Sequence, residues 1–159
     1  MQKTKQLCLL AACTGKAVGL QEVPDEAFSS EILGKGFAIE PSDGTIYAPL
    51  DARVESVAES KHAYTLLCED GLDVLIHIGV DTVGMQGQGF VSLVKAGQQV
   101  RAGERIARAD VELIRSKGLS AICSVVITNP ERLLQTEYRL GACTGGKNAV
   151  MCVQIDRKG

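Results

Sequence analysis

The sequence has no tryptophan, and aromatic residues make up only 4% of its 159 residues. Proteins that bind single-stranded nucleic acid use aromatic side chains as stacking platforms beside a basic groove. Here the formal net charge is −2, and no block of lysine and arginine occurs. The composition therefore argues against a nucleic-acid partner.

Long apolar runs are also lacking, since none approaches the roughly 18 residues that cross a bilayer. Residues 10–13 (Leu-Ala-Ala-Cys) resemble a lipoprotein cleavage box. The apolar stretch before them is only about seven residues long, at the lower limit for a signal peptide, and Cys13 runs directly into a predicted turn and strand. We therefore expect no membrane insertion and a cytoplasmic location.

CxxC pairs are absent, which argues against a zinc ribbon or a dithiol redox site. Most of the six cysteines stand among apolar or small residues, where a thiol behaves as a small hydrophobic group. We expect packing roles for them, as in a reducing cytoplasm where disulfides are rare. They are Cys8, Cys13, Cys68, Cys123, Cys143 and Cys152.

What the chain does contain is typical of a globular protein, with 45% hydrophobic and 23% charged residues. Its length is that of one domain with a sizeable core. We expect a single domain over residues 1–159, with disorder confined to residues 1–6.

Short apolar segments separated by glycine-rich turns predict an all-β fold. Turn signals recur at the spacing typical of an antiparallel β-sandwich or barrel. Residues 94–104 resemble the glycine-spaced hairpins of lipoyl carriers, which indicates a barrel-sandwich hybrid. The predicted strands are 7–11, 17–20, 36–40, 45–48, 53–58, 64–68, 72–78, 105–109, 121–128 and 149–155.

Few helical turns are expected in this fold. Asp110 is a suitable N-cap for a short helix over 111–116. Asn129 and Pro130 predict a turn before 131–134.

The chain has only two histidines, His62 and His77. The acidic turn signature at residues 69–71 (Glu-Asp-Gly) lies between their two apolar segments and predicts a hairpin. Such a hairpin brings its two arms side by side, so the imidazoles can meet at one end. A pair of imidazoles beside Gly79 and Asp81 predicts a site that handles phosphate, a proton or a metal.

These residues occur in fragments that resemble the glucose-type IIA domain of the bacterial phosphoenolpyruvate-dependent sugar phosphotransferase system. The resemblance runs from about Cys13 to Ile155. The fragments that carry it are 22–28, 33–41, 47–50, 61–64, 76–83 and 87–90. The resemblance implies an antiparallel β-sandwich with a shallow apolar depression and phosphotransferase activity.

By this resemblance His77 accepts the phosphoryl group and His62 is its catalytic partner. Imidazole suits the task because it is a good nucleophile near neutral pH and also a good leaving group. Gly79 lets the backbone approach the ring or the phosphoryl oxygens. Ser60 stands where the family has threonine or serine, and we expect it to orient His62.

The resemblance also implies the partners: the small histidine phosphocarrier protein as donor, and the cysteine-bearing IIB domain of a sugar permease as acceptor. Carboxylates would repel a phosphohistidine, so Asp81 and Asp25 are not expected to bind phosphate; the resemblance implies that they bind an arginine of the donor. An apolar collar is expected to form the docking surface. Its predicted members are Ala27, Phe28, Leu33, Leu75, Ile78 and Val83.

Two other function classes remain open at this point. One is a zinc-dependent hydrolase, with His62 and His77 as zinc ligands and Asp81 as a third. The other is a regulatory binding module whose targets respond to phosphorylation. The phosphoryl carrier itself requires no cofactor. The sequence does not specify the sugar.

Overall fold

Antiparallel strands dominate the chain, which a computed structural model describes over residues 4–156. Hydrogen bonding arranges the strands in three sheets, with orders β1-β14-β12, β4-β10-β8 and β13-β2-β3-β11-β7-β6-β5-β9. The strands are β1 (Thr4–Leu10), β2 (Gly15–Gly19), β3 (Lys35–Pro41), β4 (Thr45–Tyr47), β5 (Ala52–Val57), β6 (Ala63–Leu67), β7 (Asp73–Ile78), β8 (Phe90–Ser92), β9 (Gln99–Val100), β10 (Arg105–Ala109), β11 (Cys123–Ile127), β12 (Leu133–Tyr138), β13 (Gly141–Cys143) and β14 (Ala149–Asp156).

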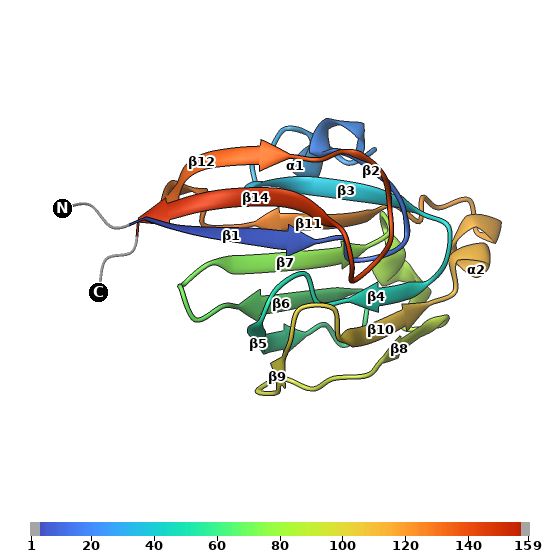
Figure 1. Cartoon of the computed structure of the whole chain (residues 1–159). Helices are drawn as coiled ribbons and strands as arrows, with labels where there is room; N and C mark the ends of the chain where they lie inside the picture. Colours follow the sequence, from blue (N-terminus) through green and yellow to red (C-terminus); the bar gives the residue numbers. More distant parts are fainter. Residues whose placement is uncertain (1–3, 157–159) are drawn as a thin grey trace.

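The main core lies between the large sheet and the two small ones, in the arrangement of a sandwich (Figure 1). Leu9 and Met151 enter it from the β1-β14-β12 sheet, and Ile106 enters it from the β4-β10-β8 sheet. Phe37 and Val125 enter it from the large sheet. The all-β sandwich predicted from the sequence is confirmed.

A second, smaller apolar cluster covers the opposite face of the large sheet. Because successive side chains of a strand point to opposite faces, Val126 of β11 belongs to this cluster while its neighbour Val125 belongs to the main core. Leu20, Val23 and Phe28 cover the cluster from outside the sheet. They lie in and around the 3₁₀ helix η1 (Leu20–Glu22) and the short helix α1 (Glu26–Ser29).

The predicted helix over 111–116 is confirmed as α2 (Val111–Ser116). The backbone N–H of Leu113 donates to the Asp110 carboxylate at 3.0 Å, which makes Asp110 its N-cap. Two further 3₁₀ turns are η2 (Thr82–Met85) and η3 (Pro130–Arg132). Helix α1 and the edge strands β8, β9, β12 and β13 have no counterpart in the expectations from sequence.

The hairpin between the two histidines is confirmed. Strand β6 pairs antiparallel with β7 from Ala63 opposite His77 to Leu67 opposite Asp73. Gly71 closes the turn with a φ of 91°, a conformation that favours glycine. One end of this hairpin therefore carries the turn, and the other carries both histidines.

Two expectations for the chain ends need correction. The first concerns the disorder expected over residues 1–6. Thr4–Gln6 belong to β1 and are ordered, and residues 1–3 lie outside the described residues.

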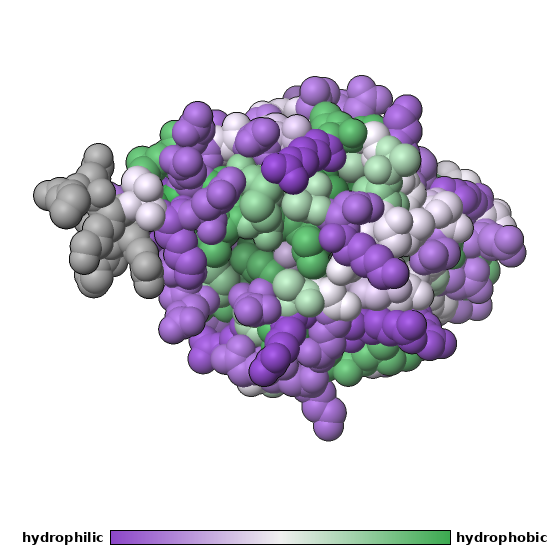
Figure 2. Space-filling view, viewed as in Figure 1, coloured by the Kyte–Doolittle hydropathy of each residue, from purple (hydrophilic) through white to green (hydrophobic). Residues whose placement is uncertain are grey.

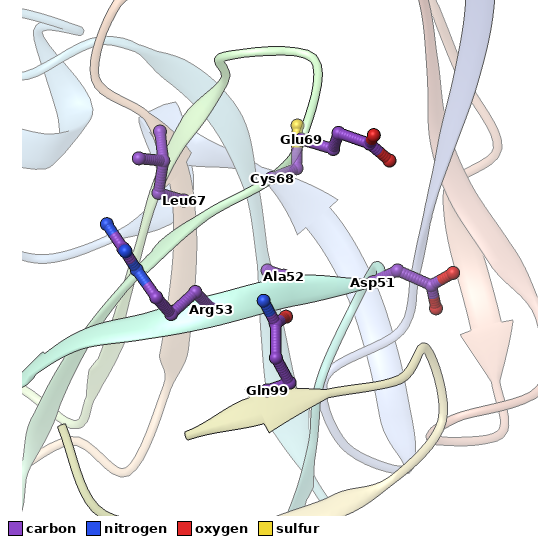
Figure 3. Close-up of a pocket in the computed structure, with 7 residues that line it drawn as sticks. All are labelled: Asp51, Ala52, Arg53, Leu67, Cys68, Glu69 and Gln99. Carbon is purple, nitrogen blue, oxygen red and sulfur yellow. The ribbon is translucent and has the colours of Figure 1, made fainter. Parts of the chain in front are cut away.

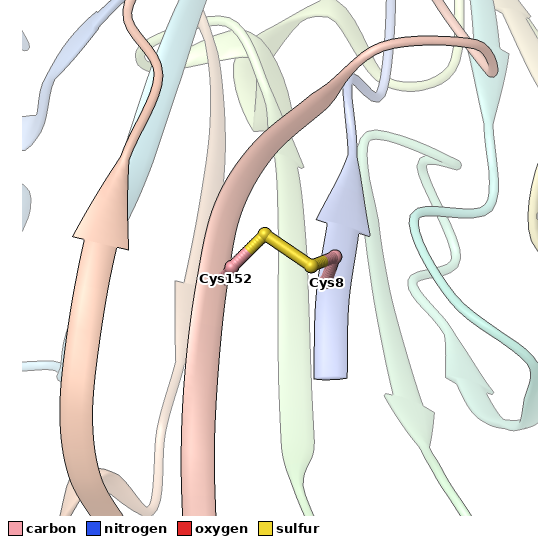
Figure 4. Close-up of a disulfide and its surroundings, with 2 residues drawn as sticks. All are labelled: Cys8 and Cys152. Carbon is pink, nitrogen blue, oxygen red and sulfur yellow. A yellow bond between two sulfur atoms is a disulfide. The ribbon is translucent and has the colours of Figure 1, made fainter. Parts of the chain in front are cut away.

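The second concerns two of the cysteines. Cys8 and Cys152 are joined by a disulfide between β1 and β14, rather than being packing thiols (Figure 4). The register sets these two cysteines directly opposite each other, a pairing that their separation of 144 positions hides in the sequence. Cys13, Cys68, Cys123 and Cys143 are free and buried.

The face of the molecule seen in Figure 2 shows apolar side chains at its centre and polar ones around its rim. No helix within residues 4–156 has the length and apolar character to span a membrane.

Candidate functional site

His77 is the fifth residue of β7, and its side chain lies on the face of the second apolar cluster. Ile76 and Ile78, its neighbours along the strand, both pack in the main core. Leu75, two residues earlier, packs against the second cluster. Strand β11 places Ser124 opposite His77, so the histidine is held between two paired strands. Its backbone is therefore rigid while its half-buried ring faces outward.

The Nδ1 atom of His77 lies 2.8 Å from the carbonyl oxygen of Gly79. A carbonyl oxygen only accepts hydrogen bonds, so Nδ1 carries the proton and donates it. In the neutral ring the lone pair is then on Nε2. This contact leaves Nε2 unprotonated and chemically able to act as a nucleophile.

His62 lies just before β6, in the turn that follows β5. Its backbone carbonyl accepts a hydrogen bond from the N–H of Ile78 at 2.7 Å. Its ring meets the ring of His77 at a centroid distance of 5.1 Å and an interplanar angle of 83°. The structure thus brings together the two histidines that the sequence singled out.

Burial lowers the pKa of both imidazoles. For His62 the loss of hydration has the largest effect, and the neighbouring His77 lowers the pKa further because two positive rings would repel each other. For His77 burial also dominates, while the hydrogen bond to Gly79 and the carboxylates of Asp25 and Asp81 act in the opposite direction. The net shift favours neutral rings near pH 7.

Phe28 forms one wall of the site. Its ring centroid lies 5.2 Å from that of His77, with the planes tilted by 57°. Only 6% of Phe28 is exposed, so the side chain is part of the second cluster as well as a neighbour of the imidazole. This packing restricts the orientation of the His77 ring.

The predicted collar divides into exposed and buried members. Val83 is 57% exposed and Leu33 is 37% exposed, whereas Ala27 and Leu75 are half-buried against the second cluster. Ile78 must be removed from the collar, because it is 2% exposed in the main core. Strand alternation points it away from His77.

Ile32, at 80% exposure, is an apolar surface residue that the sequence reasoning missed. It directly precedes Leu33 in the segment after α1. Its position next to Leu33, a predicted collar member, was the one feature of the sequence that could have pointed to Ile32.

Asp25 and Asp81 lie close enough to His77 to affect its pKa. Asp25 also has a local structural role, because its carboxylate accepts a hydrogen bond from the N–H of Ala27 at 2.9 Å and caps α1. Asp81 is exposed and has a left-handed backbone with φ of 61°. Both carboxylates therefore flank the histidine, and Asp81 is the freer of the two.

Ser60 lies in the same turn as His62 and is half-buried. Within residues 4–156 no hydrogen bond joins the two side chains, and the buried Nδ1 of His62 has no partner there. The orienting role expected for Ser60 is therefore not visible as a direct contact.

The described side chains provide no three-ligand metal site around the histidines. Among the described residues no group of three or more histidine, cysteine, aspartate or glutamate side chains is placed to hold a metal ion. The zinc-hydrolase alternative needs three protein ligands around an open position. The pair His62 and His77 lacks that third ligand.

A surface hollow of about 580 Å³ lies elsewhere (Figure 3). Leu67, Cys68 and Glu69 belong to the turn end of the β6–β7 hairpin, and Arg53 and Gln99 line it from β5 and β9. The histidines occupy the opposite end of that hairpin. The histidine end is the candidate site, because two imidazoles meet there and one of them is oriented by a backbone hydrogen bond.

Comparison with known proteins gives one consistent result. A family model described as phosphoenolpyruvate-dependent sugar phosphotransferase system, EIIA 1, matches residues 7–133. A glucose-specific EIIA component from Bacillus cereus is 38% identical over 154 residues, covering 96% of this chain and 93% of the relative. One from Staphylococcus aureus is 37% identical over 153 residues, covering 96% and 92%.

A solved structure agrees with these matches. Glucose permease IIA from Mycoplasma capricolum superposes with a TM-score of 0.86 at 32% sequence identity. The superposition covers 93% of this chain and 96% of that one.

Proposed function

This chain belongs to the EIIA 1 family of the phosphoenolpyruvate-dependent sugar phosphotransferase system, and from that membership we propose that His77 carries its phosphoryl group. As a member, the chain is a phosphotransferase component that takes the group from the histidine phosphocarrier protein and passes it to a IIB domain. The observation that supports His77 most directly is the 2.8 Å contact between its Nδ1 and the Gly79 carbonyl.

In the first transfer, the lone pair on Nε2 of His77 attacks the phosphorus of the donor's phosphohistidine. A new N–P bond forms, and the old N–P bond breaks with its electron pair returning to the donor's ring. The proton on Nδ1 stays in its hydrogen bond to Gly79 throughout. In the second transfer the cysteine thiolate of the IIB domain attacks the same phosphorus, an S–P bond forms, and Nε2 leaves with its electron pair.

His62 assists both steps as a hydrogen-bond donor. Its Nδ1 is buried without a partner among the described residues, so we assign the proton of the neutral ring to Nε2, which can donate to a phosphoryl oxygen. A donor fixed in advance stabilises the charge that develops on the transferring group. The edge-on contact with His77 places this donor beside the nucleophile.

The rim of the site recognises the partners. The exposed side chains of Leu33 and Val83 supply an apolar contact, and Asp81 offers a carboxylate to an arginine of the donor. Such a small surface suits partners that bind and leave in turn. Asp25 is a weaker candidate for arginine binding, since it already caps α1.

We place the chain in the cytoplasm, where phosphoenolpyruvate, the first phosphoryl donor of the system, is a metabolite; the Cys8–Cys152 bridge belongs to the oxidised form of the chain, and reducing conditions would open it. We propose that the transfer uses only the two imidazoles of this chain and the side chains of its partners, with no cofactor. A zinc role for His62 and His77 has no support in the arrangement of the described side chains.

The test is to incubate the protein with phosphoenolpyruvate, enzyme I and the histidine phosphocarrier protein and to measure its intact mass. We expect a gain of one acid-labile phosphoryl group. His77→Gln should show no gain, while His62→Gln should still be labelled, which makes it the matched histidine control.

A phosphoryl group retained by His77→Gln would overturn the assignment of the nucleophile. Because the named relatives are glucose-specific EIIA components, a glucose IIB domain is the first acceptor to add in a coupled assay.

A further inference from the structure

We infer that Thr82 is a positioning residue for the phosphoryl transfer, because its buried hydroxyl fixes the peptide that aims the Gly79 carbonyl at Nδ1 of His77. This inference rests on the proposed role of His77. Thr82 is the first residue of η2 and is 0% exposed, so its hydroxyl needs a partner inside the protein. That partner is the carbonyl oxygen of Ile78, to which Thr82 Oγ1 donates.

The Ile78–Gly79 peptide plane is held at both of its ends. Its carbonyl accepts the hydrogen bond from Thr82, and its N–H donates to the carbonyl of Ile122 at 2.9 Å. With both ends bonded, this plane cannot rotate without breaking a buried hydrogen bond.

The next peptide plane, Gly79–Val80, is held in the same way. Its carbonyl accepts from Nδ1 of His77 at 2.8 Å, and its N–H donates to the carbonyl of Ser120 at 3.0 Å. The φ and ψ angles of Gly79 relate the two planes to each other. The direction of the Gly79 carbonyl therefore depends on the plane that Thr82 holds.

Packing supports the same arrangement. Gly79 has a φ of 77°, and a Cβ atom there would stand 2.4 Å from Cγ2 of Thr82. Thr82 thus packs directly against Gly79, and its hydroxyl also donates a hydrogen bond to the carbonyl oxygen of Ile78, the residue before Gly79. Of the four groups that hold the two planes, only the Thr82 hydroxyl and the His77 ring come from side chains.

The experiment compares Thr82→Val, which keeps the shape and removes the hydroxyl, with Thr82→Ser, which keeps the hydroxyl. The first readout is the ¹⁵N NMR spectrum of the His77 imidazole, which reports the nitrogen that carries the proton. We expect Thr82→Val to lose the predominance of the Nδ1–H tautomer and Thr82→Ser to retain it. Initial rates of phosphorylation should fall roughly threefold to tenfold in Thr82→Val only, the rate equivalent of one hydrogen bond.

Thr128→Val is a control for removing a threonine hydroxyl that bonds β7 away from the site. The Thr128 hydroxyl also donates to a backbone carbonyl of β7, that of Asp73, at the end of the strand remote from His77. Its removal should leave both the tautomer and the rate unchanged. If Thr82→Val does not fold, Thr82→Ala against Thr82→Ser makes the same comparison without the methyl group.

Unchanged ¹⁵N shifts of His77 in the variant without the hydroxyl would overturn the inference, and so would equal losses with and without it. The tautomer is measured on the unphosphorylated protein. A failure of His77 to accept phosphate would therefore count against the proposed function and would be distinguishable from this result.

Discussion

The imidazole of His62 meets the imidazole of His77 edge to face, with ring centroids 5.1 Å apart. His77 is oriented by a hydrogen bond from its own ring to Gly79, whereas the buried Nδ1 of His62 has no partner within the described part of the chain. The two rings therefore have different hydrogen-bonding environments. Under the proposed function, His77 is the oriented nucleophile, and His62 is a donor whose partner arrives with the phosphoryl group.

His62→Gln should accept the phosphoryl group on His77 but pass it to a IIB domain slowly. We expect the onward rate to fall by roughly a hundredfold or more, the effect of removing one preorganised donor. Rapid-quench measurement of label transferred to the IIB cysteine gives this rate. Forward transfer as fast as in the unmodified protein would contradict the partner role.

Acid should destabilise the folded protein through these two rings. Burial lowers their pKa below the value of about 6.5 that they have in the unfolded chain. Between the folded and unfolded values the unfolded state binds more protons, so the free energy of unfolding decreases as the pH falls through about 6.5 and levels off below the folded pKa. The contribution of the rings to stability is thus complete above that pH.

Urea unfolding of the unmodified protein and of His62→Gln, each measured across this pH range, gives the comparison. The variant should depend less on pH. Parallel curves would show that the burial of His62 has no part in the acid sensitivity.

Gly79→Ala should destabilise the protein by about 1–3 kcal/mol, because alanine is strained at a φ of 77° and its Cβ would collide with Thr82. Phosphorylation should slow as the carbonyl moves away from Nδ1. Gly84→Ala is the control, since a Cβ there meets no described atom within 4 Å. Chemical denaturation and labelling of both variants make the test; equal stabilities would refute the expectation.

Asp81→Asn should weaken the interaction with the phosphoryl donor while leaving full phosphorylation attainable at long times. We expect KM for the phosphorylated carrier to rise roughly tenfold, the effect of one charge-assisted hydrogen bond. Asp73→Asn, an exposed carboxylate at the other end of β7, is the matched control. If both variants have the same KM, the docking role of Asp81 is wrong.

Reduction of the Cys8–Cys152 bridge should lower the free energy of unfolding by roughly 2–5 kcal/mol, the usual range for a disulfide that closes a long loop. Phosphorylation of the folded protein should not change, because β1 and β14 pair in a different sheet from β7. Denaturation with and without a thiol reductant measures the effect, and the Cys8→Ser, Cys152→Ser double variant should not respond to the reductant. A similar response from the double variant would place the reducible bond elsewhere.

The sequence predicted those features of the fold that depend on residues close to one another along the chain. The β6–β7 hairpin follows from an acidic turn between two apolar segments, and α2 follows from the cap at Asp110. The edge strands were missed because their residues are largely exposed, as in β12, so no apolar alternation marks them.

The contact between the two histidine rings was predicted from the hairpin alone, and hairpin pairing does not fully explain it. The register places His62 beside Ile78, and strict alternation would turn its ring to the face opposite His77. β6 begins only at Ala63, after a left-handed Lys61 with φ of 60°, so His62 is free of that alternation. Nothing in the sequence marked this exception. Motif resemblance identified the pair, and backbone geometry explains it.

Contacts between distant segments were beyond the reach of the sequence. Cys8 and Cys152 become partners only through the β1–β14 register, and Phe28 becomes a neighbour of His77 only when α1 lies on the large sheet. The inward direction of Ile78, by contrast, could have been predicted from its alternation with His77 along β7, so including it in the predicted collar was an avoidable error.

The bond between β1 and β14 also changes what a protease can do to this molecule. It closes residues 8–152 into a covalent ring that includes His62, His77 and Thr82. One backbone cut in any loop of that ring leaves a single connected molecule of unchanged polypeptide mass, apart from the water added at the cut. Two fragments would separate only when a reductant opens the sulfur bridge.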